Sequence, residues 1–251
     1  MQKGISITTH TRRVGWLASA AVMLVALVAV LAWQTWHLPG THAQGAANEI
    51  RLDDFNKTLK PGKTYGKWDS RKISPLLGSG DEMFFQFVHK SDEEHYIHIK
   101  SGDNNSFSLG VEVEFEVADT PMLHWDWKVT QTPKGGDVRN EDKDDQAGSI
   151  CLIVDPGLTG FKSLCYIWEN DGPKDTPITS KKRSDSRYLI LRTVKEDGKG
   201  AWFSESRNML EDYTRVFGKA PAEKAVIGIQ IDSDSTESSA EVFYRNIRRG
   251  K

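Results

Sequence analysis

The chain has 251 residues, with 33 lysines and arginines against 35 aspartates and glutamates, and a formal net charge of −2. Before Glu49 the only such residues are Lys3, Arg12 and Arg13, so the remainder holds 30 bases against 35 acids, a net charge of −5. An acidic remainder lacks the basic surface that nucleic acids and anionic lipid headgroups require, and this excludes both as partners of the main domain.

The N-terminal segment contains an uncharged run of 20 residues, Val14–Trp33. About 20 apolar residues span a bilayer, whereas a cleaved signal has a shorter apolar core of about 7–15 residues. We therefore expect a cytoplasmic segment over 1–13, a single-pass transmembrane signal-anchor over 14–38 and a linker over 39–48. The bases precede the run, which predicts an inner-membrane protein with its C-terminal domain in the periplasm. Small residues at Thr41–Ala43 leave open cleavage and release into the periplasm.

Residues 49–251 contain runs in which apolar and polar residues alternate, most regularly at Leu109–Val117 and Leu123–Val129. Period-two runs separated by Gly, Pro, Asn and Asp clusters predict an all-β domain, an antiparallel β-sandwich of the jelly-roll or galactose-binding-like kind. The other strand-like runs are Met83–Val88, Tyr96–Lys100, Ile150–Val154, Leu164–Trp168, Tyr188–Val194, Val226–Ile231 and Ala240–Ile247.

One short helix is predicted within this β-rich sequence. Asn208 and Glu211 have the spacing of a capping box, and Gly218 supplies a C-terminal stop. Between them, apolar residues recur at helical spacing, as an amphipathic helix requires.

Cys151 and Cys165 are the only cysteines, and they lie in two strand-like runs on either side of a turn at Asp155–Leu158. A hairpin centred there would bring them opposite each other, and an oxidising compartment would permit a disulfide. Two buried free thiols fit the same pattern equally well.

The tryptophans divide into two groups. Trp125 and Trp127 share the phase of apolar neighbours on their strand, which predicts that both are buried in the core. Trp68, Trp168 and Trp202 are not constrained in this way, so they are candidates for a binding surface on which sugar rings could stack.

Acidic residues gather in two loops beside predicted strands. Asp144 and Asp145 come just before one strand, and Asp232 and Asp234 follow another. We expect Arg207 to form an ion pair with Asp144 and Asp145, because its planar guanidinium can bond a carboxylate at two points. The rival is a Ca²⁺ ion shared with the second loop, and ordinary solvated turns fit as well.

Several segments follow one another in a specific order and spacing: Thr120–Val129, Glu141–Ala147, Leu164–Trp168, Trp202–Gly218, Ile227–Thr236 and Ala240–Ile247. On these segments the chain resembles a bacterial family known as domain of unknown function 3047, over roughly residues 50–248 and most strongly after Pro121. The resemblance implies export and a galactose-binding-like sandwich, and it implies no activity. The chain departs from the family pattern at Ser235, where Asn is usual, and at Arg245-Asn246, where Gly-Asp is usual.

The sequence contains no Gly-x-Ser-x-Gly, P-loop or dinucleotide-binding motif, so no catalytic residue is assigned. The favoured hypothesis is a membrane-tethered, non-catalytic domain that binds a glycan or another envelope component. Two alternatives remain: an enzyme that acts on envelope polysaccharide through loop carboxylates, and a structural partner in an envelope complex.

Overall fold

A computed structural model describes residues 49–69, 84–102, 106–111, 114–154, 161–221 and 224–251. All of them belong to one compact unit, Ala47–Lys251. The expected membrane anchor and linker lie outside the described residues. Among the described residues, no helix is long and apolar enough to cross a bilayer.

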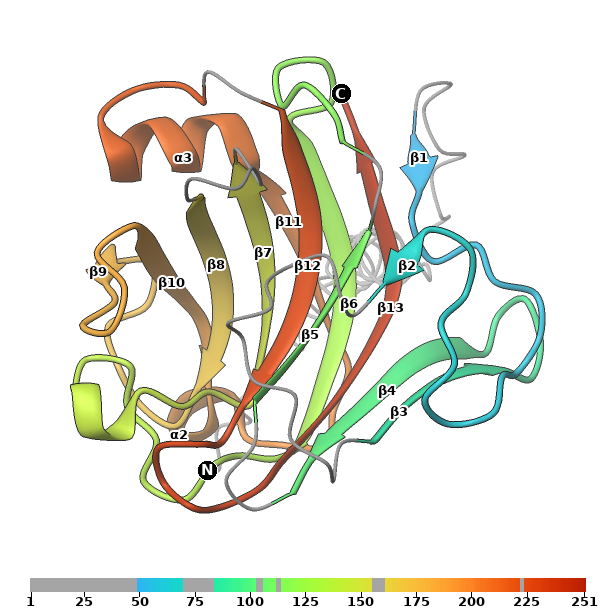
Figure 1. The fold of residues 1–251 in the computed structure, drawn as a ribbon, viewed down its shortest axis with the longest axis horizontal. Helices are drawn as coiled ribbons and strands as arrows, with labels where there is room; N and C mark the ends of the chain where they lie inside the picture. The colour runs from blue at the N-terminus through green and yellow to red at the C-terminus, as the bar shows by residue number, and fades with distance from the viewer. Residues whose placement is uncertain (1–48, 70–83, 103–105, 112–113, 155–160, 222–223) are drawn as a thin grey trace, which may run out of the picture. The chain divides into compact units, whose positions relative to one another are not determined.

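The fold is a β-rich sandwich of two sheets (Figure 1). The six-stranded sheet has the order β11 (Phe203–Asn208), β6 (Met122–Gln131), β13 (Ala240–Gly250), β4 (His95–Ser101) and β3 (Phe84–His89), with β1 (Ile50–Arg51) also paired to β13. The seven-stranded sheet has the order β2 (Trp68–Asp69), β5 (Ser106–Val111), β12 (Ala225–Asp232), β7 (Gly148–Val154), β8 (Lys162–Glu169), β10 (Ser186–Thr193) and β9 (Ile178–Thr179).

The main core lies between the two sheets. Alternate residues of β6 point into it, so Trp125 and Trp127 are 1% and 0% exposed, which confirms their predicted burial. The ring of Trp127 contacts the ring of Trp168 on β8, with centroids 5.4 Å apart. Because β6 and β8 belong to different sheets, this aromatic contact joins the inner faces of both.

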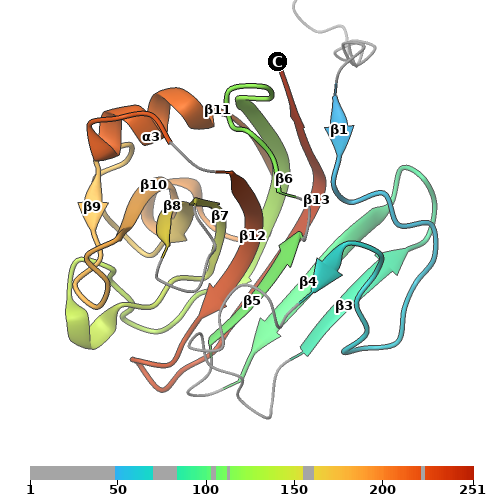
Figure 2. The same cartoon turned by 45° about the horizontal axis from the view of Figure 1, so that its top comes forward.

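One strand pair departs from the predicted antiparallel arrangement. β8 and β10 lie side by side in the seven-stranded sheet (Figure 2). They run parallel, with Tyr188 opposite Cys165. Residues 170–185 form the crossover that a parallel pair requires, and β9 within it pairs antiparallel with β10. An alternating pattern of residues is the same in both kinds of pairing, so it could not reveal this exception.

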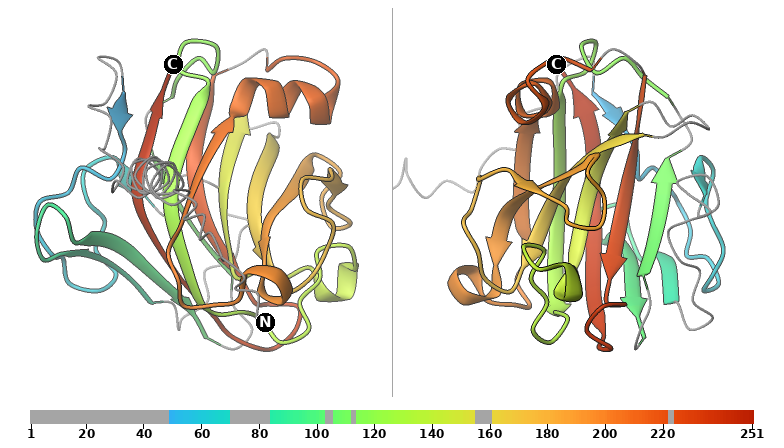
Figure 3. Two further views of the ribbon diagram at one scale, coloured as in Figure 1. Left: turned by 180° about the vertical axis from the view of Figure 1, so that it is seen from behind. Right: turned by 60° about the vertical axis from the view of Figure 1, so that its left-hand side comes forward.

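The described helical segments are η1 (Glu141–Lys143, a 3₁₀ turn), α2 (Val194–Asp197) and α3 (Met209–Phe217). α3 is the predicted helix: the side chain of Asn208 accepts from the backbone N–H of Glu211, and Gly218 ends the helix in the left-handed conformation at φ 75°. Figure 3 shows α3 and the loop with η1 at opposite ends of the seven-stranded sheet.

Candidate functional site

A cavity of about 420 Å³ opens on the face of the seven-stranded sheet that points away from the main core. Such a volume is in the range of small-molecule sites. Its lining is rich in hydroxyl, carboxyl and amide groups, with two basic side chains and two aromatic rings. The lining residues are Ser106, Asp144, Gln146, Phe161, Ser163, Cys165, Ser180, Lys182, Arg183, Ser186, Tyr188, Gln230, Asp232 and Asp234.

Strand alternation puts these side chains together. On β12, Ile229 and Ile231 point into the main core, so Gln230 and Asp232 point to the opposite face and into the cavity. Cys151 and Cys165 lie on that same outer face and are paired in register across β7 and β8. They form a disulfide. Of the two alternatives that the sequence left open, a disulfide and two free thiols, the structure has the disulfide.

One end of the cavity is acidic. Asp145 accepts backbone N–H bonds from Ser235 at 3.0 Å and from Thr236 at 2.8 Å, and these bonds hold the turn after β12. Oxygens of Asp145, Asp232 and Asp234 lie within 4.8 Å of one another. Desolvation, together with repulsion from Asp234 and Asp145, raises the pKa of Asp232 well above its usual range.

Two buried acceptors at this end have no hydrogen-bond partner among the described residues, Asp144 Oδ1 and Gln146 Oε1. Both side chains are 2% exposed and line the cavity. The other oxygen of Asp144 accepts from Ser180 Oγ at 3.2 Å. Desolvation by burial raises the pKa of Asp144 to about 6, although Lys182 and Ser180 act against it.

A further part of the lining comes from the β9–β10 loop and from β10. Lys182 Nζ lies 3.3 Å from Asp234 Oδ1. The guanidinium of Arg183 covers the ring of Phe161 at 4.1 Å from its centroid. Tyr188 extends from β10 beside them. The cavity thus places hydrogen-bond donors, acceptors and an aromatic side chain around one space.

The prediction that three tryptophans form a binding surface is wrong for two of them. Trp68 and Trp168 are 2% and 0% exposed, because each fills space between the sheets, where burial of an indole is most favourable. Trp202 is partly exposed. It packs under the guanidinium of Arg245, 4.2 Å from the ring, on the six-stranded sheet and away from the cavity residues.

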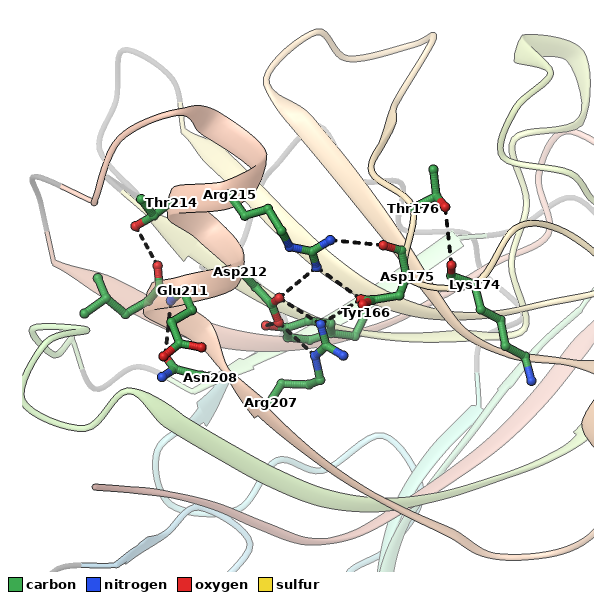
Figure 4. Close-up of polar contacts among 11 residues, drawn as sticks. Tyr166, Lys174, Asp175, Thr176, Arg207, Asn208, Glu211, Asp212, Thr214 and Arg215 are labelled. Carbon is green, nitrogen blue, oxygen red and sulfur yellow. Dashed lines mark hydrogen bonds and ion pairs between the residues drawn. The ribbon is translucent and has the colours of Figure 1, made fainter.

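The expected pairing of Arg207 with Asp144 and Asp145 is also wrong. Arg207 instead donates to Asp212 from two nitrogens, each at 2.8 Å, and to Asp175 at 2.7 Å. Figure 4 shows these side chains together beside α3. Arg207 lies one residue before the end of β11, which leads into α3. A carboxylate on that helix is therefore nearer than the η1 loop at the other end of the sheet. This cluster anchors α3, and it takes no part in the cavity.

Asp144, Asp145, Asp232 and Asp234 are the acidic residues that the sequence suggested for a site. Asp144, Asp232 and Asp234 line the cavity, and Asp145 lies behind them with an oxygen within 4.8 Å of oxygens of Asp232 and Asp234. Gln146, Lys182, Arg183, Tyr188 and Gln230 also line the cavity and were not predicted from the sequence. A signal was present in Ala225–Asp232, where the outward positions of a strand with an apolar inner face change from apolar to polar toward its end.

A family model described as protein of unknown function (DUF3047) matches residues 80–248. No curated protein matches the chain. Among solved structures, a cellulase derived from Cel12A of Rhodothermus marinus is similar at 12% identity, over 76% of this chain and 98% of that chain, with a TM-score of 0.41. The xyloglucanase domain of NopAA from Sinorhizobium fredii is 8% identical over 81% and 98%, with a TM-score of 0.44. A family 11 carbohydrate-binding module from Clostridium thermocellum is 10% identical over 81% and 96%, with a TM-score of 0.39.

Proposed function

The chain belongs to the family of proteins of unknown function DUF3047, and we propose that it is a non-catalytic binding domain that holds a glycan in the cavity on its seven-stranded sheet. A glycan offers many hydroxyl groups, each of which donates and accepts hydrogen bonds. The cavity has the matching inventory of carboxyl, amide and hydroxyl side chains.

The observation that carries the proposal is an unpaired carboxylate oxygen of Asp144. Its Oδ1 is buried, faces the cavity and has no donor among the described residues. A buried acceptor left unpaired costs about 1–3 kcal/mol. A hydroxyl group of a bound sugar would donate to this oxygen and remove that cost. Pairing of this oxygen therefore favours the binding of a ligand with hydroxyl donors.

The charge of the lining favours a neutral ligand. Three carboxyl groups, those of Asp144, Asp232 and Asp234, line the cavity with two cationic side chains, those of Lys182 and Arg183. Such a lining offers a polyanion no net positive surface. Tyr188 adds an aromatic surface suited to the C–H faces of a pyranose ring.

The disulfide supports the location that the proposal includes. A bond between Cys151 and Cys165 persists in an oxidising compartment. It agrees with an exported domain, which residues 14–38 would tether to the inner membrane so that the cavity faces envelope glycans.

The test is a glycan-array screen of the full chain in a non-ionic detergent without a sugar headgroup, followed by calorimetry with the best ligand. Asp144→Asn turns one carboxylate oxygen into a donor and is expected to weaken binding at least tenfold. The matched control is Asp142→Asn, an exposed aspartate two residues away that does not line the cavity.

Trp202→Ala separates the two faces of the molecule. Unchanged binding in this variant supports the cavity, whereas loss in Trp202→Ala with full binding in Asp144→Asn would move the site to the six-stranded sheet. The ligand recovered from the titration is also assayed for new reducing ends, and their appearance would replace the binding function with that of a hydrolase.

A further inference from the structure

Three carboxyl groups meet at the acidic end of the cavity, and Lys182 contacts one of them. Oxygens of Asp145, Asp232 and Asp234 lie within 4.8 Å of one another. Like charges at this separation repel. Asp145 is held by the two N–H groups of the turn after β12, which keeps the turn and the Asp234 it carries in place.

A separate observation points to what these groups bind. Gln146 is 2% exposed, and its Oε1 has no hydrogen-bond partner among the described residues. The backbone N–H of Asp232 donates to the backbone carbonyl of Gln146 at 3.1 Å, so the two residues lie side by side where both line the cavity. A buried amide oxygen and two carboxyl groups that line the same cavity offer hard oxygen donors.

We propose that Asp232, Asp234 and the side-chain oxygen of Gln146 bind a divalent cation of the calcium type at the acidic end of the cavity. Ca²⁺ takes six to eight oxygen ligands, among them carboxylates and amide carbonyls in irregular geometry, whereas Mg²⁺ demands near-octahedral geometry. Two carboxylates and an amide oxygen leave the remaining positions to water. The inference concerns the cavity without a glycan and does not depend on glycan binding.

Lys182 is the competitor within the protein. Its ammonium lies 3.3 Å from Asp234 Oδ1, and its side chain is 39% exposed. A cation that binds Asp234 displaces this ammonium, and the exposed stem of Lys182 can carry it into solvent. The protein's own positive charge therefore weakens cation binding, and its removal provides a sharp test.

The experiment is a calorimetric titration of the full chain with CaCl₂ and, separately, MgCl₂, after treatment with a chelating resin. Binding of one Ca²⁺ with a Kd on the order of 10⁻⁴ M is expected, as for extracellular calcium modules, with weaker binding of Mg²⁺. Saturating Ca²⁺ should raise the melting temperature, and EDTA should reverse the rise. No heat of binding and no melting shift at 10 mM, a concentration about a hundredfold above that Kd, would overturn the proposal. Tighter binding of Mg²⁺ than of Ca²⁺ would also overturn it.

Three variants assign the site. Asp232→Asn removes a ligand and also some repulsion, so the apo protein should melt no lower than wild type while the Ca²⁺ shift disappears. Lys182→Met should tighten Ca²⁺ binding about tenfold, because a nearby positive charge is lost. The control Asp171→Asn alters an exposed carboxylate outside the cavity and should bind as wild type. A shift retained in Asp232→Asn, or affinity in Lys182→Met no higher than in wild type, would refute the assignment.

The glycan and cation proposals fail separately. Glycan titrations run once in EDTA and once in CaCl₂ report on the glycan, and Ca²⁺ titrations without glycan report on the ion. Absence of glycan binding in both buffers leaves the cation result intact.

Discussion

The indole Nε1 of Trp127 donates a 3.1 Å hydrogen bond to Glu205 Oε1 on the neighbouring strand β11. The same oxygen accepts from Arg192 Nε of β10 at 2.6 Å, so Glu205 links an edge strand of one sheet to a strand of the other. One of the two buried indoles of β6 thereby donates to a polar bridge between the sheets.

We expect Trp127→Ala to lower the free energy of unfolding by about 3–5 kcal/mol, as truncation of a buried aromatic does. The loss combines lost packing with the removal of a donor to Glu205. Urea unfolding followed by circular dichroism measures it. Trp202→Ala, at a partly exposed position, should cost about 1 kcal/mol or less. Equal losses in the two variants would contradict the assignment of Trp127 to the core.

Glu169, which is 0% exposed at the end of β8, should make stability fall as pH rises. Desolvation raises the pKa of its carboxyl to about 8, although N–H groups of Asn170 and Val138 act against it. The folded state therefore binds more protons than the unfolded state between the ordinary pKa and about 8, and the stabilisation present at low pH is lost across that window.

The measurement is the difference in unfolding free energy between wild type and Glu169→Gln at pH 5, 6.5 and 8. The glutamine of the variant cannot ionise. Its free energy of unfolding should therefore rise relative to that of wild type as pH rises, by up to about 1.4 kcal/mol for each unit of pKa difference. In the control Glu211→Gln, which changes an exposed residue, the free energy of unfolding should vary with pH as it does in wild type. A difference between Glu169→Gln and wild type that does not vary with pH would contradict the prediction.

Reduction of the disulfide should destabilise the domain by about 2–4 kcal/mol, the usual range for a loop of this length, since Cys151 and Cys165 are 14 residues apart. Reductant should lower the melting temperature of the wild type and leave that of a Cys151→Ser, Cys165→Ser double variant unchanged. Mass spectrometry under denaturing conditions counts the thiols. Two free thiols in the untreated protein would disprove the bond.

Arg207→Ala should cost about 1.5–3 kcal/mol, the value of hydrogen bonds to a charged group. Burial alone would raise the pKa of Asp212, but bonds from Arg207 and Arg215 lower it overall, so this carboxylate depends on its arginines. A double-mutant cycle should find coupling between Arg207→Ala and Asp212→Ala, and additivity between Arg207→Ala and Asp144→Ala. Coupling to Asp144 instead would restore the pairing that the sequence suggested.

Local features of this chain could be predicted from its residues alone. Alternation at Leu123–Val129 put Trp125 and Trp127 in the core, and both are there. Asn208 and Gly218 marked the two ends of α3. These predictions succeed because strand faces and helix caps depend on residues only a few positions apart.

Other features were decided only by the tertiary structure. Trp168 is buried in the core because the ring of Trp127, from the other sheet, packs against it. Arg207 turns to Asp212 because β11 leads directly into α3. The cavity gathers Asp144, Lys182 and Asp232 from three separate segments. Which strands become neighbours, and whether a pair runs parallel as β8 and β10 do, depends on how whole sheets pack. An alternating sequence specifies which face a residue takes and leaves its partners to that packing, because the period of two is the same for every neighbour.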